Sequence, residues 1–428
     1  MKNLKNPRED AFSALIFAQR GGYLEDFFQK TSLLKKDLAL AYEIAHGVQR
    51  RKLSLEFLAD QLYLSNQPTN KKGSKKLKAK KLKLKTKERL LLYTALYQYF
   101  FMDRVPFYAV VDETVKLVKK YFHPRLAAFF NALLRSLEKK ELSLPEGQSL
   151  EELSVFYSYP QFFVEQLIKQ YGLEKTKKFL EVMNKPAPLM VRLRASEDDV
   201  LKEKDSFETV FSGKLKVLQL KKGEKLETYF KDSRFYIQNV TPVYLIEKLS
   251  EGLNFKPAKI LDLCSAPGGK LLALRDLLPS SKLYANDVSE EKIKLLQENL
   301  EKYQITEVTI SKGKAEEFCS LEKFDLIVLD VPCSNSGVLN KRAEARWRLE
   351  PQKLKELKVQ QFQMLKHAVS LLSDKGQIWY LTCSILPEEN EVMLTKVQKE
   401  LGLKVKSSFL QLPNLEGWDG GFGCSLSR

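Results

Sequence analysis

The chain has 428 residues, of which 44% are hydrophobic, and its formal net charge is +17. This length is sufficient for two or three domains, each with its own hydrophobic core. No uncharged apolar run reaches the roughly 18 residues that a membrane-spanning helix needs, and the N-terminus leads into a charged amphipathic stretch. We therefore expect a cytoplasmic protein with no membrane partner.

The cysteine content argues against structural cross-links. The five cysteines are Cys264, Cys319, Cys333, Cys383 and Cys424. They are odd in number and widely spaced, they form no Cys-x-x-Cys motif, and the chain has only three histidines. This pattern indicates neither a disulfide framework nor a zinc site, so we expect no bound metal.

The positive charge is concentrated near the N-terminus. Residues 1–150 hold 29 Lys and Arg against 15 Asp and Glu, which accounts for +14 of the net charge. Ten lysines lie between Lys71 and Lys87. A run of this kind cannot pack, so we expect a mobile loop that gains affinity for RNA by neutralising phosphates. The alternative is a solvated loop that only improves solubility, because lysines carry no base specificity.

Residues 1–145 are predicted to form an all-helical domain. Ala11, Leu15 and Ala18 share one helix face, and a second apolar face follows over residues 38–45. Strongly apolar segments predict further helices over residues 90–102 and 108–121, and a last helix ends near Arg135. The apolar stripes by themselves indicate only the core of a helical bundle.

A small α/β connector domain is expected over residues 150–225. Tyr159-Pro160 opens a helix that reaches about residue 171, and short strands are predicted at 189–193, 217–220 and 235–238. Arg192 lies in the first of these strands. It is a candidate phosphate contact, with a solvated strand face as the equally good alternative.

Residues 226–428 show βα alternation, which predicts a doubly wound, Rossmann-like parallel sheet. The expected strands are 259–264, 282–286, 308–311, 324–329 and 377–381, and the expected helices include 291–303 and 351–372. Segments 403–412 and 421–426 are expected to form an antiparallel hairpin at one edge of the sheet.

A glycine turn follows the first of these strands. The segment is Cys264, Ser265, Ala266, Pro267, Gly268, Gly269 and Lys270. It has neither the G-x-G-x-x-G spacing of a dinucleotide site nor the spacing of a phosphate-binding P-loop. The carboxyl end of such a strand is where nucleotide-like ligands bind, so a nucleoside-like cofactor without a pyrophosphate, such as S-adenosylmethionine, fits. The alternative is a turn whose glycines serve packing alone.

An acidic residue stands at the end of the second strand. Asp287 lies about 20 residues beyond the glycine turn, where a carboxylate can accept hydrogen bonds from ribose hydroxyls. It could instead cap the helix that begins near Glu290, a role that Ser289 could also fill.

Two cysteines follow neighbouring strands. One strand ends in Asp330-Val331-Pro332-Cys333, and the next ends in Thr382-Cys383. Adjacent parallel strands would bring both thiols to the edge that carries the cofactor turn. A thiolate can add to C6 of a cytosine and make C5 nucleophilic. A base must later remove the C5 proton, and an acid must donate a proton or a hydrogen bond at N3. A single cysteine is more often a small buried apolar residue.

These segments carry two resemblances. Residues 37–51, 102–106 and 130–135 resemble the NusB-type RNA-binding bundle, and the motifs at 262–270, 330–334 and 382–384 resemble the RNA cytosine-5 methyltransferases. Together, nearly the whole chain resembles the RsmB/Sun/Fmu family, which methylates a cytosine of small-subunit (16S) ribosomal RNA.

The resemblance implies roles for individual residues. It implies that Cys383 is the nucleophile, that Cys333 assists product release, and that Asp330 serves both the cofactor region and cytosine N3. It also implies that residues 264–270 and Asp287 bind S-adenosylmethionine and that rRNA is the partner. We expect a monomer.

One departure and three alternatives remain. The family has Gly-Asp-Ala near the adenine where this chain has Gly313-Lys314-Ala315, so either Lys314 belongs to a different adenine site or Glu316 takes over. The same chemistry on tRNA or another RNA is one alternative. A DNA cytosine-5 methyltransferase, with the cysteine of the Pro-Cys motif as nucleophile, is another. The third is a non-catalytic RNA-binding assembly factor.

Overall fold

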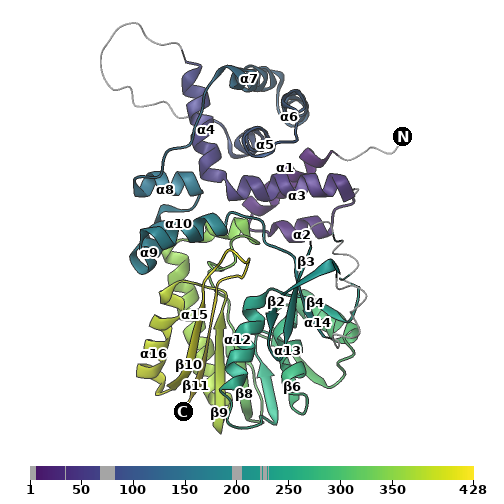
Figure 1. The fold of residues 1–428 in the computed structure, drawn as a ribbon, viewed down its shortest axis with the longest axis vertical. Helices are drawn as coiled ribbons and strands as arrows, with labels where there is room; N and C mark the ends of the chain where they lie inside the picture. Colours follow the sequence, from purple (N-terminus) through teal and green to yellow (C-terminus); the bar gives the residue numbers. More distant parts are fainter. Residues whose placement is uncertain are drawn as a thin grey trace. The chain divides into compact units, whose positions relative to one another are not determined.

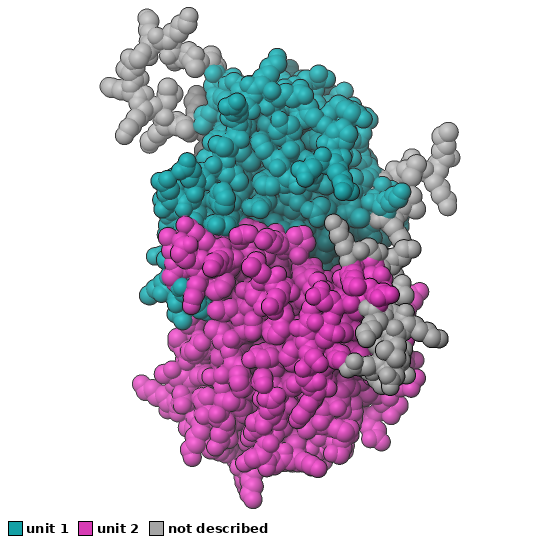
Figure 2. All heavy atoms as spheres, viewed as in Figure 1, with its two compact units in different colours: residues 1–171, 342–347 teal, residues 172–341, 348–428 magenta. Residues whose placement is uncertain are grey.

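The chain divides into two compact units. The computed structural model describes residues 6–33, 35–67, 82–194, 205–221, 224, 229 and 231–428. The helical unit comprises Met1–Tyr171 with Arg342–Trp347, and the α/β unit comprises Gly172–Lys341 with Arg348–Arg428 (Figure 2). Among the described residues, none of the helices has the length and apolar character needed to cross a membrane.

The helical unit confirms the all-α expectation. Its main helices are α1 (Pro7–Gln19), α2 (Leu24–Gln29), α3 (Lys35–Arg50), α4 (Lys52–Ser65), α5 (Thr86–Phe101), α6 (Phe107–Tyr121), α7 (Pro124–Arg135), α8 (Leu150–Tyr157) and α9 (Gln161–Tyr171), with a 3-10 turn η1 at Ser136–Lys139 (Figure 1). One continuous core joins α1 to α7. A Cβ at Gly47 of α3 would lie 1.9 Å from the Tyr97 ring of α5, so these helices can approach closely only with glycine there.

The end of the lysine run is ordered. Residues 71–81 lie outside the described part of the chain. Residues 82–87 do not form the loop expected for them, because Leu82 is buried and Leu84 packs against the helical core. The backbone N–H of Leu82 also donates to the Asp60 carboxylate at 3.1 Å. The leucines between the lysines therefore hold this segment at the start of α5.

A short segment from much later in the chain belongs to the helical unit. The 3-10 helix η4 (Ala343–Arg348) carries Arg346, whose guanidinium is buried and donates to the carbonyls of Arg50 at 2.9 Å and Ser158 at 3.2 Å. It also lies 4.0 Å from the centroid of the Tyr159 ring. The unit therefore extends past the expected boundary at 145, and it includes residues that the sequence placed elsewhere.

The α/β unit begins with a helix and a small antiparallel sheet. Helix α10 (Leu173–Val182) precedes strands β1 (Met190–Leu193), β2 (Phe207–Ser212), β3 (Lys216–Leu220) and β4 (Phe235–Ile237), which are ordered β2-β3-β1-β4. The expected strands at 189–193, 217–220 and 235–238 are present, and β2 was not expected. Since β4 completes this sheet, the small sheet reaches beyond residue 225.

Arg192 is neither a phosphate contact nor part of a solvated face. Its side chain is fully buried, and its Nη1 atom lies 3.0 Å from Oδ2 of Asp276. Burial lowers the pKa of Arg192 to about 10, although Asp276 opposes the effect. Arg194 pairs with the same carboxylate at 2.7 Å. Both arginines thus fasten the small sheet to the helix that follows the glycine turn.

The main sheet has seven strands in the order β10-β11-β9-β8-β5-β6-β7. The parallel strands are β5 (Lys259–Asp262), β6 (Lys282–Asp287), β7 (Val308–Lys312), β8 (Phe324–Asp330) and β9 (Leu372–Thr382), and the antiparallel edge is β10 (Lys404–Gln411) with β11 (Gly421–Ser427). Every strand expected here is present, including the hairpin.

Helices cover both faces of this sheet (Figure 1). Alternate strand residues face opposite cores, since Ile260 packs with α12 (Val240–Glu251), α13 (Gly269–Leu277) and α14 (Glu290–Lys302), whereas Leu261 packs with α15 (Pro351–Leu371) and α16 (Glu391–Leu401). This alternation is what a parallel strand buried on both faces requires. The fold is therefore the doubly wound α/β sheet that the sequence predicts.

Candidate active site

The glycine turn connects β5 to α13, and backbone hydrogen bonds fix its conformation. The N–H of Ser265 donates to the carbonyl of Asn286 at 2.9 Å, and the N–H of Gly268 donates to the carbonyl of Ser265 at 2.7 Å. Gly268 has φ 102°, which a residue with a side chain rarely adopts. A Cβ at Gly269 would lie 2.9 Å from the Tyr236 ring. The turn therefore brings bare backbone to the mouth of a pocket.

This pocket has a volume of about 200 Å³. Seven expected site residues line it: Cys264, Ser265, Ala266, Pro267, Gly269, Lys270 and Asp330. Residues that the sequence did not single out also line it: Tyr236, Ile237, Gln238, Pro242 and Asp262. Polar atoms of Asp262, Ser265 and Gln238 are buried there, and Oε1 of Gln238 has no hydrogen-bond partner among the described residues. Buried polar atoms beside a glycine backbone fit a polar, nucleoside-like ligand such as S-adenosylmethionine.

Three expected cofactor residues do not line the pocket. Gly268 lies within the turn. Asp287 is buried, and its carboxylate accepts hydrogen bonds from the N–H groups of Ala266 at 3.1 Å and Val288 at 2.8 Å. Ser289, not Asp287, caps α14. Lys314 is exposed and pairs with Glu317 at 2.7 Å. Asp287 therefore stabilises the glycine turn through the N–H of Ala266, while Lys314 pairs with Glu317 at the surface.

An ion pair joins the turn to the strand that precedes Cys333. Nζ of Lys270 lies 2.5 Å from Oδ2 of Asp330. Burial by itself lowers the pKa of Lys270, yet the charge of Asp330 and the hydrogen bond with it raise the pKa above its ordinary value. Asp262 and Cys383 act in the same direction. Lys270 is thus a fixed positive charge inside the site.

The two cysteines meet as the strand order predicts. Strands β8 and β9 are parallel neighbours, and the Sγ atoms of Cys333 and Cys383 lie 2.8 Å apart as free thiols. Sγ of Cys383 also donates to Oδ1 of Asn335 at 3.2 Å. The hydrogen bond with Cys383 and then burial raise the pKa of Cys333 well above its ordinary value. In this arrangement Cys333 stays protonated while Cys383 faces Lys270.

A polar network that the sequence did not reveal holds both cysteine loops. The carboxylate of Glu389, in the 3-10 helix η5 (Pro387–Glu389), accepts from the N–H of Ser334 at 2.9 Å and from its hydroxyl at 2.5 Å. The hydroxyl of Ser384 lies 3.2 Å from that of Ser334 and 2.9 Å from that of Ser336. Each loop is therefore fixed to the other through side chains adjacent to the thiols.

The signals for these additional residues were weak. Asp262 belongs to the segment that ends in the glycine turn, but its burial depends on neighbouring strands. Glu389 lies in an acidic stretch, Glu388-Glu389-Asn390-Glu391, which reads as a solvated helix start. Only the position of η5 beside Cys333 distinguishes Glu389 from its neighbours.

Known proteins match both halves of the chain. Residues 253–417 match the family described as 16S rRNA methyltransferase RsmB/F, and residues 5–139 match the NusB family. The chain is 27% identical to ribosomal RNA small subunit methyltransferase B of Photorhabdus laumondii, with 100% of both chains covered. It is 24% identical to the probable ribosomal RNA small subunit methyltransferase B of Bacillus subtilis, with 98% of both covered.

Solved structures share the fold. The structure of PH0851 aligns over 99% of both chains with a TM-score of 0.76 and 22% identity. A methyltransferase homolog from Pyrococcus horikoshii aligns over 67% of this chain and 100% of its own, with a TM-score of 0.57 and 22% identity. The family matches, together with the glycine turn and its pocket, identify a methyltransferase region of the 16S rRNA methyltransferase RsmB/F family at residues 253–417 and a NusB-family region at residues 5–139.

Proposed function

We propose that the protein methylates C5 of a cytosine in 16S rRNA through a covalent bond between Cys383 and C6. The observation that carries this proposal is the pair of free thiols, 2.8 Å apart, on the two strand ends beside Lys270 and Asp330. Methylation of a nitrogen or an oxygen would need no thiol, whereas C5 of cytosine must first be activated. The relatives are rRNA methyltransferases by name, which supports rRNA as the substrate.

Activation begins with the thiolate of Cys383. It adds to C6, the C5–C6 double bond becomes a C6–S bond, and the ring is left as an electron-rich enamine. C5 of the enamine takes the electrophilic methyl group that bound S-adenosylmethionine would supply; a C5–CH3 bond forms, the S–CH3 bond breaks, and S-adenosylhomocysteine would be left. A base then removes the C5 proton, the C5–C6 double bond re-forms, and the thiolate of Cys383 leaves. Two groups must therefore act in sequence, a nucleophile and a base.

Electrostatics favour Cys383 as the nucleophile. Cys383 interacts electrostatically with the Lys270 ammonium. The pKa of Cys333 is raised by its hydrogen bond to Cys383, by burial and by the charge of Glu389, which all oppose a Cys333 thiolate in the resting enzyme. Once Cys383 bonds to C6, that hydrogen bond is lost and the pKa of Cys333 falls. Cys333 then becomes competent to take the C5 proton.

Asp330 and the glycine turn complete the site. Oδ2 of Asp330 accepts a hydrogen bond from Lys270, so Oδ1 would accept a hydrogen bond from N3–H once N3 is protonated in the enamine. Residues 264–270 would hold the cofactor, with Asp262, Ser265 and Gln238 as its polar partners. Asp287 would act by supporting the N–H of Ala266. Lys314 pairs with Glu317 and is the least supported member of the expected set.

The test is methyl transfer from labelled S-adenosylmethionine to unmodified 16S rRNA, with adducts trapped on denaturing gels. Cys383→Ala should abolish both label and adduct, because the proposal makes Cys383 the thiol that bonds to C6. Cys333→Ala should accumulate a protein–RNA adduct, because the C5 proton stays in place. Cys319→Ala is the matched control, since Cys319 is exposed and should leave activity unchanged.

The alternatives give different outcomes. If Cys333→Ala loses the adduct while Cys383→Ala retains it, the nucleophile assignment is reversed, as in a DNA cytosine-5 methyltransferase. If the wild-type protein labels tRNA and not rRNA, the chemistry stands and the substrate changes. If calorimetry detects no S-adenosylmethionine binding, the protein is a non-catalytic RNA-binding factor. Digestion of labelled RNA to nucleosides must yield 5-methylcytidine.

A further inference from the structure

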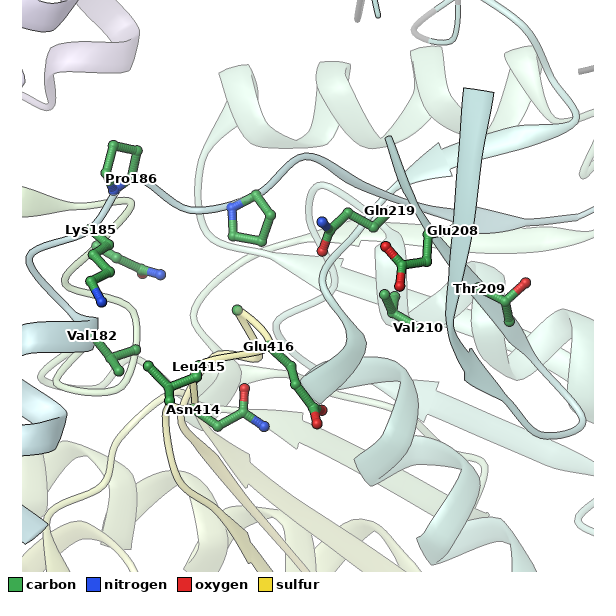
Figure 3. A pocket seen from close by; sticks show the side chains of 13 residues that line it. Val182, Lys185, Pro186, Glu208, Thr209, Val210, Gln219, Asn414, Leu415 and Glu416 are labelled. Atoms are coloured by element: carbon green, nitrogen blue, oxygen red, sulfur yellow. The ribbon is translucent and has the colours of Figure 1, made fainter. Parts of the chain in front are cut away.

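A second cavity lies in the α/β unit, outside the cofactor pocket. Its volume is about 600 Å³, three times that of the pocket beside the glycine turn. The walls come from the segment after α10 (Lys185–Pro188), from strands β2 and β3, and from the hairpin loop before β11 (Asn414–Gly417) (Figure 3). Asn340, seven residues after Cys333, also lines it. Cavities of this size hold a nucleotide.

The cavity lining holds two carboxylates, Glu208 and Glu416, and one cation, Lys185, whose charge is paired with Glu181 at 2.9 Å. Glu208 of β2 and Gln219 of β3 are directly paired across the strands, so their side chains share one face of the small sheet. Glu416 projects from the hairpin loop (Figure 3). Within the described residues, no hydrogen bond or ion pair engages the side chains of Glu208, Gln219 or Glu416. Two free carboxylates repel a phosphate and attract a ligand rich in N–H donors.

Apolar surfaces complete the lining. Val182, Pro186, Pro188 and Leu415 are apolar residues of the lining, and Pro188 lies against Gly417 of the hairpin loop. Such surfaces suit the flat face of a nucleobase, while the carboxylates suit its edge. Among bases, guanine presents N1–H and N2–H side by side, which match the two oxygens of one carboxylate. The cavity therefore has the chemistry of a guanine site.

The hairpin loop connects this cavity to the two cysteines. The N–H of Gly420 donates to the carbonyl of Gly337 at 2.7 Å, and the N–H of Gly337 donates to the carbonyl of Cys383 at 2.9 Å. A Cβ at Gly337 would lie 2.4 Å from the carbonyl oxygen of Gly420, so the two backbones touch. A ligand against Asn414–Gly417 thus contacts the same loop that packs on the Cys333 segment.

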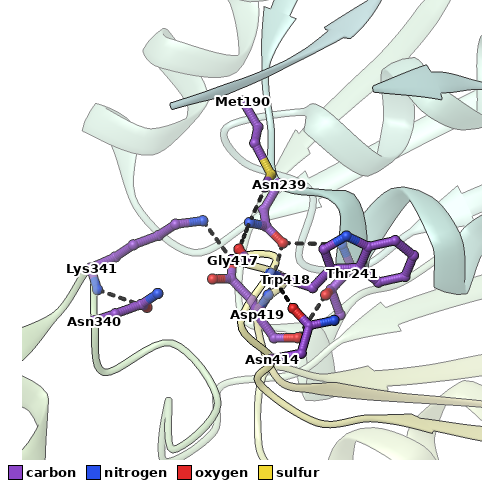
Figure 4. A network of polar contacts seen from close by, with 9 residues as sticks. All are labelled: Met190, Asn239, Thr241, Asn340, Lys341, Asn414, Gly417, Trp418 and Asp419. Carbon is purple, nitrogen blue, oxygen red and sulfur yellow. Dashed lines mark hydrogen bonds and ion pairs between the residues drawn. The ribbon is translucent and has the colours of Figure 1, made fainter. Parts of the chain in front are cut away.

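A polar network keeps that loop rigid (Figure 4). Lys341 pairs with the buried carboxylate of Asp419 at 2.6 Å, and the N–H of Asp419 donates to Oδ1 of Asn239 at 3.0 Å. The hydroxyl of Thr241 donates to the carbonyl of Asp419 at 2.7 Å. Within the loop, the N–H of Trp418 donates to Oδ1 of Asn414 at 3.0 Å. The cavity wall is preformed, as a specificity site requires.

We propose that this cavity binds an unpaired guanine of the substrate RNA close to the target cytosine, an inference that rests on the proposed function. Sequence-specific recognition of RNA uses unstacked bases that are read on their edges, and a base whose neighbour is extruded loses stacking. The carboxylate of Glu208 or of Glu416 accepts the N1–H and N2–H of the guanine with its two oxygens, and Gln219 contacts the remaining edge. The site selects which cytosine is methylated.

The test measures kcat/KM on rRNA transcripts in which each guanine near the labelled cytosine is replaced, one at a time, by inosine, which lacks the 2-amino group. For the wild-type protein, one position should lower kcat/KM by about tenfold. Glu208→Gln or Glu416→Gln should lower kcat/KM by about 10- to 100-fold on the guanine RNA and show no further loss with inosine at that position. Glu400→Gln, an exposed carboxylate on α16, is the matched control.

Each outcome decides a different point. If the variants lose the same factor on every RNA, or if the inosine and glutamine effects multiply, the cavity does not read this guanine and the proposal is wrong. If the wild-type protein methylates rRNA and no guanine matters, the proposal is also wrong while the proposed function stands. If the wild-type protein does not methylate any RNA, the proposed function is what fails. Unchanged S-adenosylmethionine binding and thermal unfolding show that the variants are folded.

Discussion

Asp262 is the most strongly perturbed carboxyl group in the cofactor pocket. It is 1% exposed, and burial, with the charge of Asp330 second, raises its pKa to about 7 from an ordinary 3.8. Lys270 opposes this shift without cancelling it. A carboxyl that changes its charge near neutral pH can serve either as an acceptor for a cationic ligand or as a neutral donor. The protonation state of Asp262 therefore affects both the free energy of unfolding and the electrostatic potential in the cofactor pocket.

The stability of the free protein should fall as pH rises through this window. The folded state holds the Asp262 proton up to about pH 7, whereas the unfolded state releases it near 3.8, so unfolding becomes easier between these values. The full shift corresponds to a loss on the order of 4 kcal/mol in the free energy of unfolding. Thermal unfolding from pH 5 to pH 8 should show a Tm decline that Asp262→Asn reduces by several degrees.

A surface carboxylate provides the control for this pH series. Asp374 is fully exposed, and Asp374→Asn should leave the pH dependence of Tm as it is in the wild type. If Asp262→Asn has the same pH dependence as the wild-type protein, Asp262 is already ionised in the fold and its raised pKa is wrong.

Single residues also show where sequence reasoning reaches its limit. The sequence predicts that three cysteines lie at the carboxyl ends of strands, because their neighbours along the chain define those strand ends: Cys264, Cys333 and Cys383. Arg192 could not be, because its burial depends on Asp276, 84 positions later in the chain. Asp287 stands at the expected strand end, yet its carboxylate points back at the turn. Burial and direction are decided by partners that no local pattern contains.

At the scale of elements, the strands were predictable and the connections were not. Apolar segments predicted β5, β6 and β8 to within a few residues, because parallel strands inside a sheet are buried on both faces, whereas β7 is an edge strand with the alternating sequence Val-Thr-Ile-Ser-Lys. Strand β9 begins at Leu372, five residues before its predicted start, through the polar segment Ser373-Asp374-Lys375. A register shift between Phe324 and Leu326 accommodates this extension. Irregular pairing of this kind leaves no apolar pattern to read.

The short helix η5 is the element on which the thiol geometry depends. Glu389→Gln keeps the size of the side chain but replaces one carboxylate oxygen with an NH2 donor, so either the hydroxyl of Ser334, bonded to Oε2, or the amide of Gln361, bonded to Oε1, loses its acceptor. Loss of hydrogen bonds to a buried charge should lower kcat about 10- to 100-fold. Affinity for S-adenosylmethionine should be unchanged, because Glu389 does not line the cofactor pocket.

The pH profile separates this positioning role from simple misfolding. After its hydrogen bond to Cys383 and its burial, the charge of Glu389 is a further cause of the raised pKa of Cys333. Glu389→Gln should therefore lower the pKa of Cys333 and shift the acid limb of adduct resolution, on which the rate rises as Cys333 loses its proton, to lower pH. Glu391→Gln, an exposed neighbour on α16, should leave rate and profile unchanged. A Glu389→Gln enzyme with a normal rate would mean that Ser334 is held without the carboxylate.

At the scale of the molecule, residues 342–347 belong to the helical unit, which the sequence pattern does not predict. Residues 342–347 follow the Cys333 loop by only a few positions, yet Arg346 and Trp347 hydrogen bond to backbone carbonyls of Arg50 and Gln49. Residues 150–171 likewise belong with the helices, where Leu53 donates to Ser158 at 2.9 Å. Long-range contacts of this kind decide to which compact unit a segment belongs. The sequence pattern alone predicts only approximate bounds for the regions 1–145, 150–225 and 226–428.

The net charge is the other property of the whole molecule, and the lysines of residues 71–81 supply seven of its positive charges. Replacing these seven lysines with glutamine keeps the chain length and leaves Leu82 in its packed position. If the run neutralises RNA phosphates, each lysine that makes such a contact adds about 0.7–0.9 to the slope of log Kd against log salt concentration. The variant should therefore bind rRNA more weakly at low salt and show a flatter salt dependence. Methylation at saturating RNA should stay normal, because the thiols and the pocket are unchanged.

Titrations of labelled rRNA at several salt concentrations measure the slope, and glutamine at the exposed Lys399 and Lys404 of the α/β unit controls for net charge alone. An unchanged slope with reduced solubility would assign the run to solvation instead.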